Sequence, residues 1–339
     1  MKDKTITIKD VAKIAGVSVS TVSRALNNYS DINQETKEKI FSVVKELGYK
    51  PNNIARSLSS SRTFRLGMLV EDNEGTGRLN PLVLEMIIGF KNTSSKLGYE
   101  TVLLSTTSDI QRNEKLQKIF KEKQLDGMFI MGLKMTDQYY DELSNIDKPC
   151  VLLDVNINNP NVACIGVDNV RGSFLAVEHL IKSGHKKIGF INGHKDAYVS
   201  YERLDGYFLA HSRYKLPVDN SLIENADFTD EGAQEAVKRL LQRHKDITAI
   251  FCASDLMATG AIYSLTNCGY SVPEDISVVG FDDIHLAECI VPRLTTIRQD
   301  AKKIGTSAAS LLVNLVQGQH MGRIVIEPEL IVRESTKRI

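Results

Sequence analysis

The chain has 339 residues, of which 42% are hydrophobic and 25% are charged, and its 42 basic and 42 acidic side chains cancel. This composition excludes a disordered chain, and no apolar run reaches the length of a signal peptide or a membrane span. We therefore expect a cytoplasmic protein of about two or three globular domains, without a membrane partner.

The charges are unevenly distributed along the chain. Residues 1–62 hold 11 Lys and Arg against 6 Asp and Glu, whereas residues 63–339 hold 31 against 36, which gives balances of +5 and −5. A basic segment joined to an acidic body indicates a polyanionic partner for the basic segment alone. A chance excess on a solvated face gives the same balance, so charge by itself leaves both interpretations open.

The first 50 residues predict three short helices. Thr7-Ile-Lys-Asp10 has the Ser/Thr-x-x-acid pattern of a helix start, where the Thr7 hydroxyl accepts from a backbone amide. Gly16 then ends the first helix in the left-handed conformation, and Ser18 caps the next one. The apolar residues expected to face the helical core are Val11, Ala12, Ile14, Ala15, Val22, Ala25, Leu26, Ile40, Val43, Val44 and Leu47.

The second helix, at about Ser20–Asn27, and the third, at about Gln34–Leu47, complete a helix-turn-helix unit. By shape alone this unit is a weak signal, because many small helical bundles contain such a corner. The exposed side of the second helix adds short hydroxyls and one arginine, Arg24. These groups suit a DNA major groove, where hydroxyls reach phosphates or base edges and an arginine binds guanine through two hydrogen bonds.

The stretch TIKDVAKIAGVSVSTVSRALNN and its continuation ELGYKPNNIARSLSSSRT resemble the lactose/galactose repressor family of bacterial transcription factors. The resemblance extends over essentially the whole chain and implies double-stranded operator DNA as a partner. It places Val19, Ser20 and Arg24 at base edges. It also places six residues near phosphates, namely Thr7, Thr21, Ser23, Asn27, Asn33 and Tyr49. Thr21 and Asn27 are alternatively local helix caps.

A hinge is expected at residues 51–63. Pro51 can start a helix, but the short segment Pro51–Leu58 forms only a marginal one in water without tertiary support. The resemblance implies that this helix forms on operator DNA, where Leu58 from each of two subunits enters the minor groove and Ala55 lies beside the groove floor. Leu58 is alternatively a core residue under a serine linker. The hinge would join a DNA-binding domain at residues 1–50 to a body at residues 64–339.

From Arg65 onward, short β-branched runs alternate with helical patterns, which predicts an α/β fold with parallel sheets. The strand candidates are residues 66–70, 101–105, 127–131, 150–154, 187–191, 249–253 and 276–281, and the helix candidates include residues 170–182, 231–243 and 255–267. The resemblance implies a two-lobed body similar to periplasmic binding proteins. We expect an N-lobe at residues 64–166 and 297–325, and a C-lobe at residues 167–296 and 326–339.

Ligands of open parallel sheets bind beyond the carboxyl ends of strands, so the cleft between two lobes is the expected effector site. Asp154, Ser254 and Asp282 follow predicted strands, and Arg203 lies shortly after another. With Phe228 as an aromatic cover, these residues suit a polyhydroxylated ligand, and the resemblance to sugar-binding members supports the same site. Spacing alone also allows Asp154 and Asp282 to cap loops.

Departures from the family pattern narrow the effector. The resemblance puts Leu82 and Val83 in the effector site, where purine-responsive members have aromatic residues, so a nucleobase is disfavoured. Ser310 stands where an arginine would bind a phosphorylated carrier protein, which disfavours a protein corepressor. The chain ends without leucine heptads, which predicts a homodimer.

Features of enzymes and metal proteins are missing from the sequence. No P-loop, G-x-S-x-G or H-E-x-x-H motif is present, so we expect no catalysis. The cysteines form an odd, scattered set without a C-x-x-C pair: Cys150, Cys164, Cys252, Cys268 and Cys289. We expect reduced core thiols, no metal and no cofactor. The predicted function is therefore that of a repressor whose effector is a sugar, a sugar derivative or a sugar phosphate.

Overall fold

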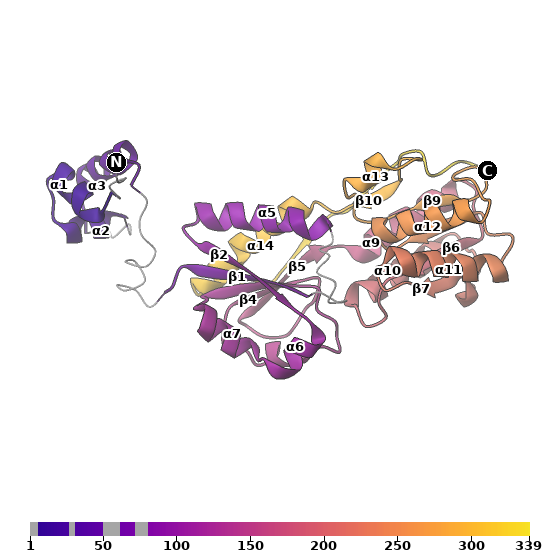
Figure 1. Ribbon diagram of the computed structural model, residues 1–339, viewed down its shortest axis with the longest axis horizontal. Coiled ribbons are helices and arrows are strands. Elements are labelled where there is room, and N and C mark those ends of the chain that lie inside the picture. The colour runs from indigo at the N-terminus through magenta and orange to yellow at the C-terminus, as the bar shows by residue number, and fades with distance from the viewer. Residues whose placement is uncertain (1–5, 27–30, 50–61, 72–80) are drawn as a thin grey trace. The chain divides into compact units, whose positions relative to one another are not determined.

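The structure, a computed structural model, describes residues 6–26, 31–49, 62–71 and 81–339. The chain forms two compact units, Met1–Phe64 and Arg65–Ile339 (Figure 1). Asn27, Ala55 and Leu58 lie outside the described residues, so the hinge and the domain boundaries around it stay predictions. Within the described ranges, no helix combines the length and the apolar character needed to cross a membrane.

The described residues of the first unit contain the three predicted helices, α1 (Ile8–Ala15), α2 (Val19–Leu26) and α3 (Gln34–Leu47). Their shared core contains the fully buried side chains of Val11, Ala15, Val22, Ala25 and Ile40. The prediction was wrong for Ile14, which is 54% exposed. The buried face of α1 consists of Val11, Ala12 and Ala15, and Ile14 lies outside this face.

The ends of these helices follow the predicted caps. Thr7 and Asp10 form a capping box at α1, in which the Asp10 carboxylate accepts from the Thr7 N–H at 2.8 Å. Gly16 ends α1 with a φ of 69°, a left-handed conformation that glycine adopts without strain. Ser18 Oγ accepts from the Thr21 N–H at 3.0 Å and so caps α2.

The N-lobe of the second unit is a six-stranded parallel sheet in the order β11-β5-β4-β3-β1-β2. Its strands are β1 (Arg65–Glu71), β2 (Glu100–Thr106), β3 (Gly127–Met131), β4 (Cys150–Leu153), β5 (Val162–Val167) and β11 (Arg323–Ile326). Its helices are α5 (Pro81–Lys96), α6 (Ser108–Asn113), α7 (Leu116–Lys123), α8 (Gln138–Leu143) and α14 (Ala301–Val316). Figure 1 shows α5 and α14 on one face of this sheet and α6 and α7 on the other.

The C-lobe is a four-stranded parallel sheet in the order β7-β6-β8-β9. Its strands are β6 (Ile188–Asn192), β7 (Ile223–Asn225), β8 (Ala249–Cys252) and β9 (Ser277–Val279). Its helices are α9 (Asn169–Lys182), α10 (Tyr198–Arg213), α11 (Asp230–Arg243), α12 (Asp255–Asn267) and α13 (Leu286–Cys289), with a short 3₁₀ turn at Asn220–Leu222. Helices and strands therefore alternate as predicted, and each lobe has its own apolar core.

The chain crosses between the lobes three times, after β5, after β10 (Thr296–Arg298) and after β11. β10 pairs with β12 (Glu329–Ile331) in a two-stranded antiparallel ribbon at these crossings. The N-lobe is therefore discontinuous in sequence, because α14 and β11 join it only after the C-lobe has been traced.

α14 approaches α5 closely because glycines stand where the two helices meet. A Cβ added at Gly89 would lie 2.4 Å from the Lys302 carbonyl oxygen, and one added at Gly305 would lie 2.1 Å from the Met86 carbonyl oxygen. Contacts this short are not tolerated, so a side chain at either position would separate the helices.

The five cysteines are free, which agrees with reduced thiols. Cys150, Cys164 and Cys252 are buried as expected. The expectation was wrong for Cys268 and Cys289, which are exposed because each lies at the C-terminal end of a helix, α12 or α13, beyond its buried residues.

Candidate nucleic-acid interface and effector site

The exposed side of α2 carries the residues predicted to face base edges. Val19 is 41% exposed, and Ser20 is exposed beside it, with its hydroxyl 2.6 Å from that of Ser18. The Arg24 side chain is 50% exposed and forms an ion pair with Asp31. A guanine contact by Arg24 through two hydrogen bonds would compete with this ion pair.

Several residues predicted to lie near phosphates serve as helix caps in the protein alone. The Thr7 hydroxyl donates to Asp10 at 2.7 Å, and Asn33 Oδ1 accepts from the Thr36 N–H at 2.8 Å at the start of α3. The Thr21 hydroxyl lies 2.8 Å from that of Ser18. In the protein alone, Thr21 therefore makes a local contact at the start of α2, as its alternative role as a local helix cap would require. Helix N-termini attract phosphate groups, so capping and phosphate contact are compatible at Thr7 and Asn33.

Arg203 forms the centre of the predicted effector site. It projects from α10, is only 4% exposed, and donates from Nε to Asn169 Oδ1 at 2.9 Å and from Nη1 to the Ala253 carbonyl oxygen. Its guanidinium carbon lies 3.9 Å from the ring centroid of Phe281 and 6.0 Å from that of Phe228. Among the described residues, none accepts a hydrogen bond from Nη2, so this nitrogen has donors left for a ligand.

Two carboxylates from different lobes lie within electrostatic reach of Arg203. Burial raises the pKa of Asp154, at the end of β4, and of Asp282, after β9, to about 6 in each case, and the Arg203 charge opposes both shifts. Burial lowers the pKa of Arg203, and these carboxylates counteract that effect. The structure thus brings together three residues that are distant in sequence.

Asp154 and Asp282 also make the loop contacts that spacing alone allowed. Asp154 Oδ1 accepts from the Val167 N–H at 3.2 Å, and Asp282 Oδ1 accepts from the Gln299 side-chain amide at 2.6 Å. Both residues have positive φ, 60° for Asp154 and 126° for Asp282. Such backbone strain is common at ligand sites, because the surrounding structure must hold it in place.

The other predicted effector residues make the following local contacts. The Phe228 ring lies against Gly193, where an added Cβ would sit 2.0 Å from the ring. Ser254 is 2% exposed and caps α12, with Oγ accepting from the Met257 N–H at 3.2 Å. Leu82 and Val83 are half-buried in the first turn of α5. Their contact with an effector stays a prediction.

Asn169 is a residue of this site that the sequence did not reveal. Its amide nitrogen donates to Glu202 Oε2 at 3.0 Å and approaches Asp154 Oδ1 at 3.5 Å, while its oxygen accepts from Arg203. It lies at the first lobe crossing and links the N-lobe carboxylate to the C-lobe guanidinium. Its only sequence signal is its position in the first turn of a helix that follows an aspartate cap.

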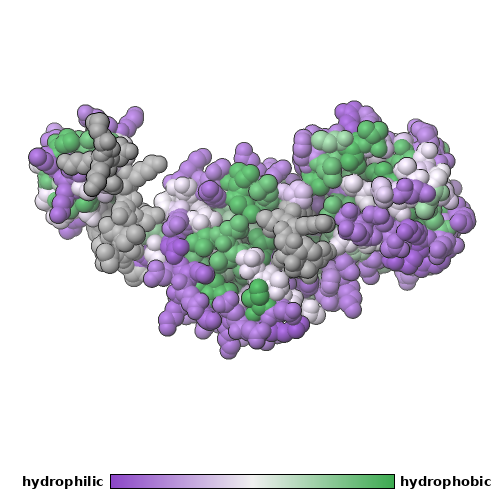
Figure 2. Space-filling view, in the orientation of Figure 1, coloured by the Kyte–Doolittle hydropathy of each residue, from purple (hydrophilic) through white to green (hydrophobic). Residues whose placement is uncertain are grey.

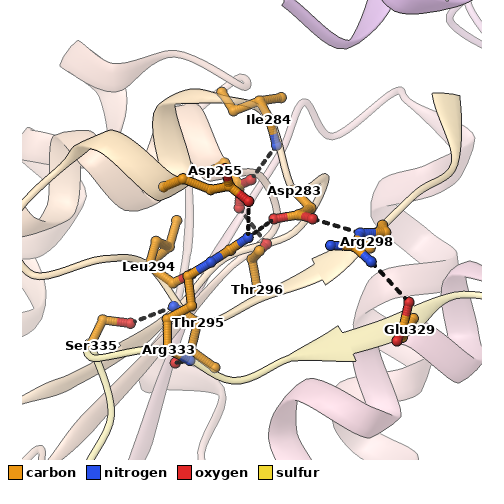
Figure 3. Close-up of polar contacts among 11 residues, drawn as sticks. Asp255, Asp283, Ile284, Leu294, Thr295, Thr296, Arg298, Glu329, Arg333 and Ser335 are labelled. Atoms are coloured by element: carbon orange, nitrogen blue, oxygen red, sulfur yellow. Dashed lines mark hydrogen bonds and ion pairs between the residues drawn. The ribbon is translucent and has the colours of Figure 1, made fainter. Parts of the chain in front are cut away.

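The loop that carries Asp282 is held to the lobe crossings by buried charges (Figure 3). The neighbouring Asp283 accepts from Arg298 Nε at 2.7 Å and pairs with Arg333 Nη2 at 2.7 Å. Arg298, the last residue of β10, also donates to Glu329 of β12 at 3.2 Å. Fully buried Asp255 binds the same loop, accepting from the Ile284 N–H at 2.9 Å. Asp282 therefore sits on a loop tied directly to β10 through Arg298 and to the segment after β12 through Arg333.

A polar cavity of about 510 Å³ lies at the carboxyl ends of β2, β3 and β6, and His194 in its lining follows Gly193, against which the Phe228 ring lies. Its lining comes from both lobes and consists of Ser108, Arg112, Lys134, Thr136, Asp137, Gln138, His194 and Asp196. None of the predicted effector residues lines it. Lys134 and His194 also follow strands, but they were not among the predicted effector residues. Across the lobe boundary, the Met135 N–H donates to the Asp196 carbonyl oxygen at 3.0 Å.

A helix-turn-helix unit together with a two-lobed α/β body that holds a buried polar cluster defines a DNA-binding regulator controlled by a small molecule. The family model described as "Bacterial regulatory proteins, lacI family" matches residues 7–52, and the "Periplasmic binding protein-like domain" matches residues 177–336. The chain belongs to the lacI family of bacterial regulatory proteins, whose members are transcriptional repressors that bind DNA and respond to small-molecule effectors.

Relatives of known function match along their whole length. The chain is 34% identical to the HTH-type transcriptional repressor PurR of Aliivibrio salmonicida (strain LFI1238), with 98% of this chain and 99% of the relative covered. The transcriptional regulator CelR–cellobiose complex is similar in structure, with a TM-score of 0.76, 32% identity, and 97% and 99% of the two chains covered. The lac repressor dimer bound to operator and the anti-inducer ONPF gives a TM-score of 0.73, 28% identity, and coverage of 98% and 100%.

Proposed function

We propose that this chain represses transcription as a homodimer bound to a palindromic operator, and that a sugar or sugar derivative bound around Arg203 changes its operator affinity. The effector class is inferred from the buried Arg203 guanidinium. It stacks on Phe281 and interacts electrostatically with Asp154 and Asp282. Carboxylates accept from sugar hydroxyls and a guanidinium donates to hydroxyl oxygens, so the three groups together suit a polyhydroxylated ligand.

Control of DNA binding follows from the origin of these groups in different lobes. Asp154 belongs to the N-lobe, Arg203 belongs to the C-lobe, and Asn169 hydrogen-bonds to Arg203 at the first crossing. A ligand that replaces these contacts changes the relative stability of lobe arrangements, which would change how two hinges meet operator DNA. The coupling must be reciprocal, so operator DNA would alter effector affinity by the same factor.

Exposed apolar side chains on the second unit support the homodimer. Leu84 and Ile88 on α5 are 54% and 46% exposed, and Tyr263 on α12 and Val291 after α13 are 59% and 90% exposed. Figure 2 shows hydrophobic residues on the face of the body that carries α5 and α13. Apolar side chains gathered in this way are typical of protein–protein contacts. A dimer with two helix-turn-helix units would read two half-sites of a palindrome.

The proposal is tested by selecting bound sites from random DNA and then measuring operator affinity by fluorescence anisotropy across a panel of sugars at millimolar concentration. We expect palindromic sites and a shift in affinity with at least one sugar. Arg203→Gln should keep operator binding and lose the sugar response. Arg213→Gln, an exposed arginine at the end of the same helix, is the matched control and should respond as the wild type does. An Arg203→Gln protein that still responds would refute the effector site.

A further inference from the structure

The cavity of about 510 Å³ between the lobes contains a cation without a close ionic partner. The Lys134 side chain is only 12% exposed, and its Nζ lies 3.9 Å from Glu71 Oε1. No described residue accepts a hydrogen bond from Nζ, although an ammonium group carries three donors. A buried charge is costly unless it is paired and hydrogen-bonded, so the site lacks a partner for Lys134.

Glu71 is not that partner, because its oxygens are already engaged. Oε1 lies 3.1 Å from the Ser108 hydroxyl, and Oε2 accepts from the Gln111 side-chain amide. Burial raises the pKa of Glu71 to about 8, with the neighbouring Asp137 contributing, so most Glu71 is neutral at pH 7. Glu71 therefore offers Lys134 neither a hydrogen bond nor a full negative charge at pH 7.

Asp137, the other buried acid of the cavity, is satisfied in the same way. Oδ1 accepts from the Ser108 hydroxyl at 2.9 Å, and Oδ2 accepts from the backbone N–H of Lys134 at 2.8 Å. Asp137 also hydrogen-bonds to Glu71, and neither Asp137 oxygen is hydrogen-bonded to the Lys134 ammonium.

Two further donors line the cavity, one from each lobe. His194 Nδ1 accepts from the Asp196 N–H at 3.0 Å, so the neutral ring carries its proton on Nε2, which is a donor. Arg112 stands at the solvent side, 69% exposed and paired with Asp109 at 2.9 Å. The Asp196 carboxylate is the one acid of the lining without a hydrogen bond to a described residue, and it suits a ligand hydroxyl.

We propose that this cavity binds the anionic group, a phosphate or a carboxylate, of a sugar effector, with Lys134 as its principal contact and His194 and Arg112 as further donors. This assignment rests on the proposed function, since it identifies the chemical class of the same effector. Charge-assisted hydrogen bonds to Lys134 would supply the missing partner, and the ligand hydroxyls would meet Asp196. Because Lys134 belongs to the N-lobe and His194 to the C-lobe, the bound anion would link the lobes directly.

Isothermal titration of the full chain tests the assignment with inorganic phosphate, hexose 6-phosphates, hexuronates and the parent neutral hexoses. At least one anionic sugar should bind about tenfold more tightly than its neutral parent, and inorganic phosphate should compete with it. Comparing the phosphate and uronate series identifies which anion the cavity selects. If neutral hexoses bind as tightly as every anionic probe, the proposal is overturned.

Variants separate Lys134 from general effects of charge. Lys134→Met keeps the length of the side chain and should lose about tenfold in affinity for the anion, whereas Lys134→Arg should retain most of it. Lys118→Met, on α7 with a side chain that is 57% exposed, is the control and should leave binding unchanged. Operator binding without ligand shows that each variant is folded. Equal anion affinity in Lys134→Met and wild type would contradict the assignment.

The outcome also distinguishes this inference from the proposed function. If neutral sugars change operator affinity and anionic sugars bind no better, the cavity assignment fails while effector-controlled repression stands. If no sugar changes operator affinity, the proposed function fails, and the loss or retention of phosphate binding in Lys134→Met still decides whether the cavity is an anion site.

Discussion

Replacing Glu71 with glutamine is expected to stabilise the protein, by an amount that grows with pH. The Glu71 side chain is 0% exposed, and burial is the largest cause that raises its pKa from 4.5 to about 8. Glutamine resembles the protonated acid in shape, with one carbonyl acceptor and one N–H donor group. Its carbonyl oxygen can therefore still accept from Ser108 or Gln111, as the carboxyl group does.

The size of the effect follows from proton linkage. Between pH 4.5 and about 8 the folded state retains a proton that the unfolded state has released, so the free energy of unfolding falls as pH rises through this window. The slope is about 1.4 kcal/mol per pH unit, which sets an upper limit of about 3 kcal/mol at pH 7 and about 4 kcal/mol at pH 8. Relaxation around the ionised group would lower these values, so about 2 kcal/mol at pH 7 is a realistic expectation.

Urea unfolding followed by far-UV circular dichroism at pH 5, 7 and 8.5 measures this difference, since the chain has no tryptophan for fluorescence. Glu71→Gln and wild type should be nearly equal in stability at pH 5 and diverge above it. Glu85→Gln, on the exposed side of α5, should show no such divergence. If Glu71→Gln is instead destabilised at pH 8.5, Glu71 is ionised and paired with Lys134, and the reasoning about both groups is wrong.

Two further predictions concern specificity and coupling. Arg24→Ala should weaken operator binding by about 1 to 3 kcal/mol and relax preference at one base pair, which anisotropy on single-substitution operators would show; a uniform loss would indicate a phosphate contact. Arg298→Gln, which removes the contacts that join β10 to Asp283 and β12, should reduce the coupling between effector and operator by about 1 kcal/mol with little change in either affinity alone. Arg293→Gln, which breaks an exposed pair of 2.7 Å, is its control, and equal coupling losses in both would exclude a special role for Arg298.

Helices with clear periodicity and caps could be predicted from the sequence almost to the residue. α3 (Gln34–Leu47) and α12 (Asp255–Asn267) have the predicted bounds, because apolar spacing and a following Gly48 or a preceding Ser254 mark their ends. The strands β5, β7, β10, β11 and β12 were not predicted. β10 and β12 have three residues each, with charged residues included, and their pairing depends on the lobe crossings rather than on local propensity.

The candidate site was predictable in part. The rule that ligands lie after strand ends, together with the family resemblance, led to Arg203, Asp154 and Asp282, whose charges act on one another in the structure. Lys134 was missed because a lysine after a strand is ordinary on a protein surface, and only its burial beside Glu71 distinguishes it. Burial of a single charged side chain is a tertiary property, so no local pattern reveals it.

The late return of α14 and β11 to the N-lobe has a consequence for biosynthesis. On the ribosome the chain emerges from its N-terminus, so β1 to β5 appear while the helix that covers α5 and the strand that pairs with β5 are still untranslated. The strands of the C-lobe sheet are contiguous in sequence, so this sheet can form before the N-lobe sheet is complete. Nascent chains therefore pass through a period in which the apolar surface around Met86 and Phe90 is not yet covered by α14.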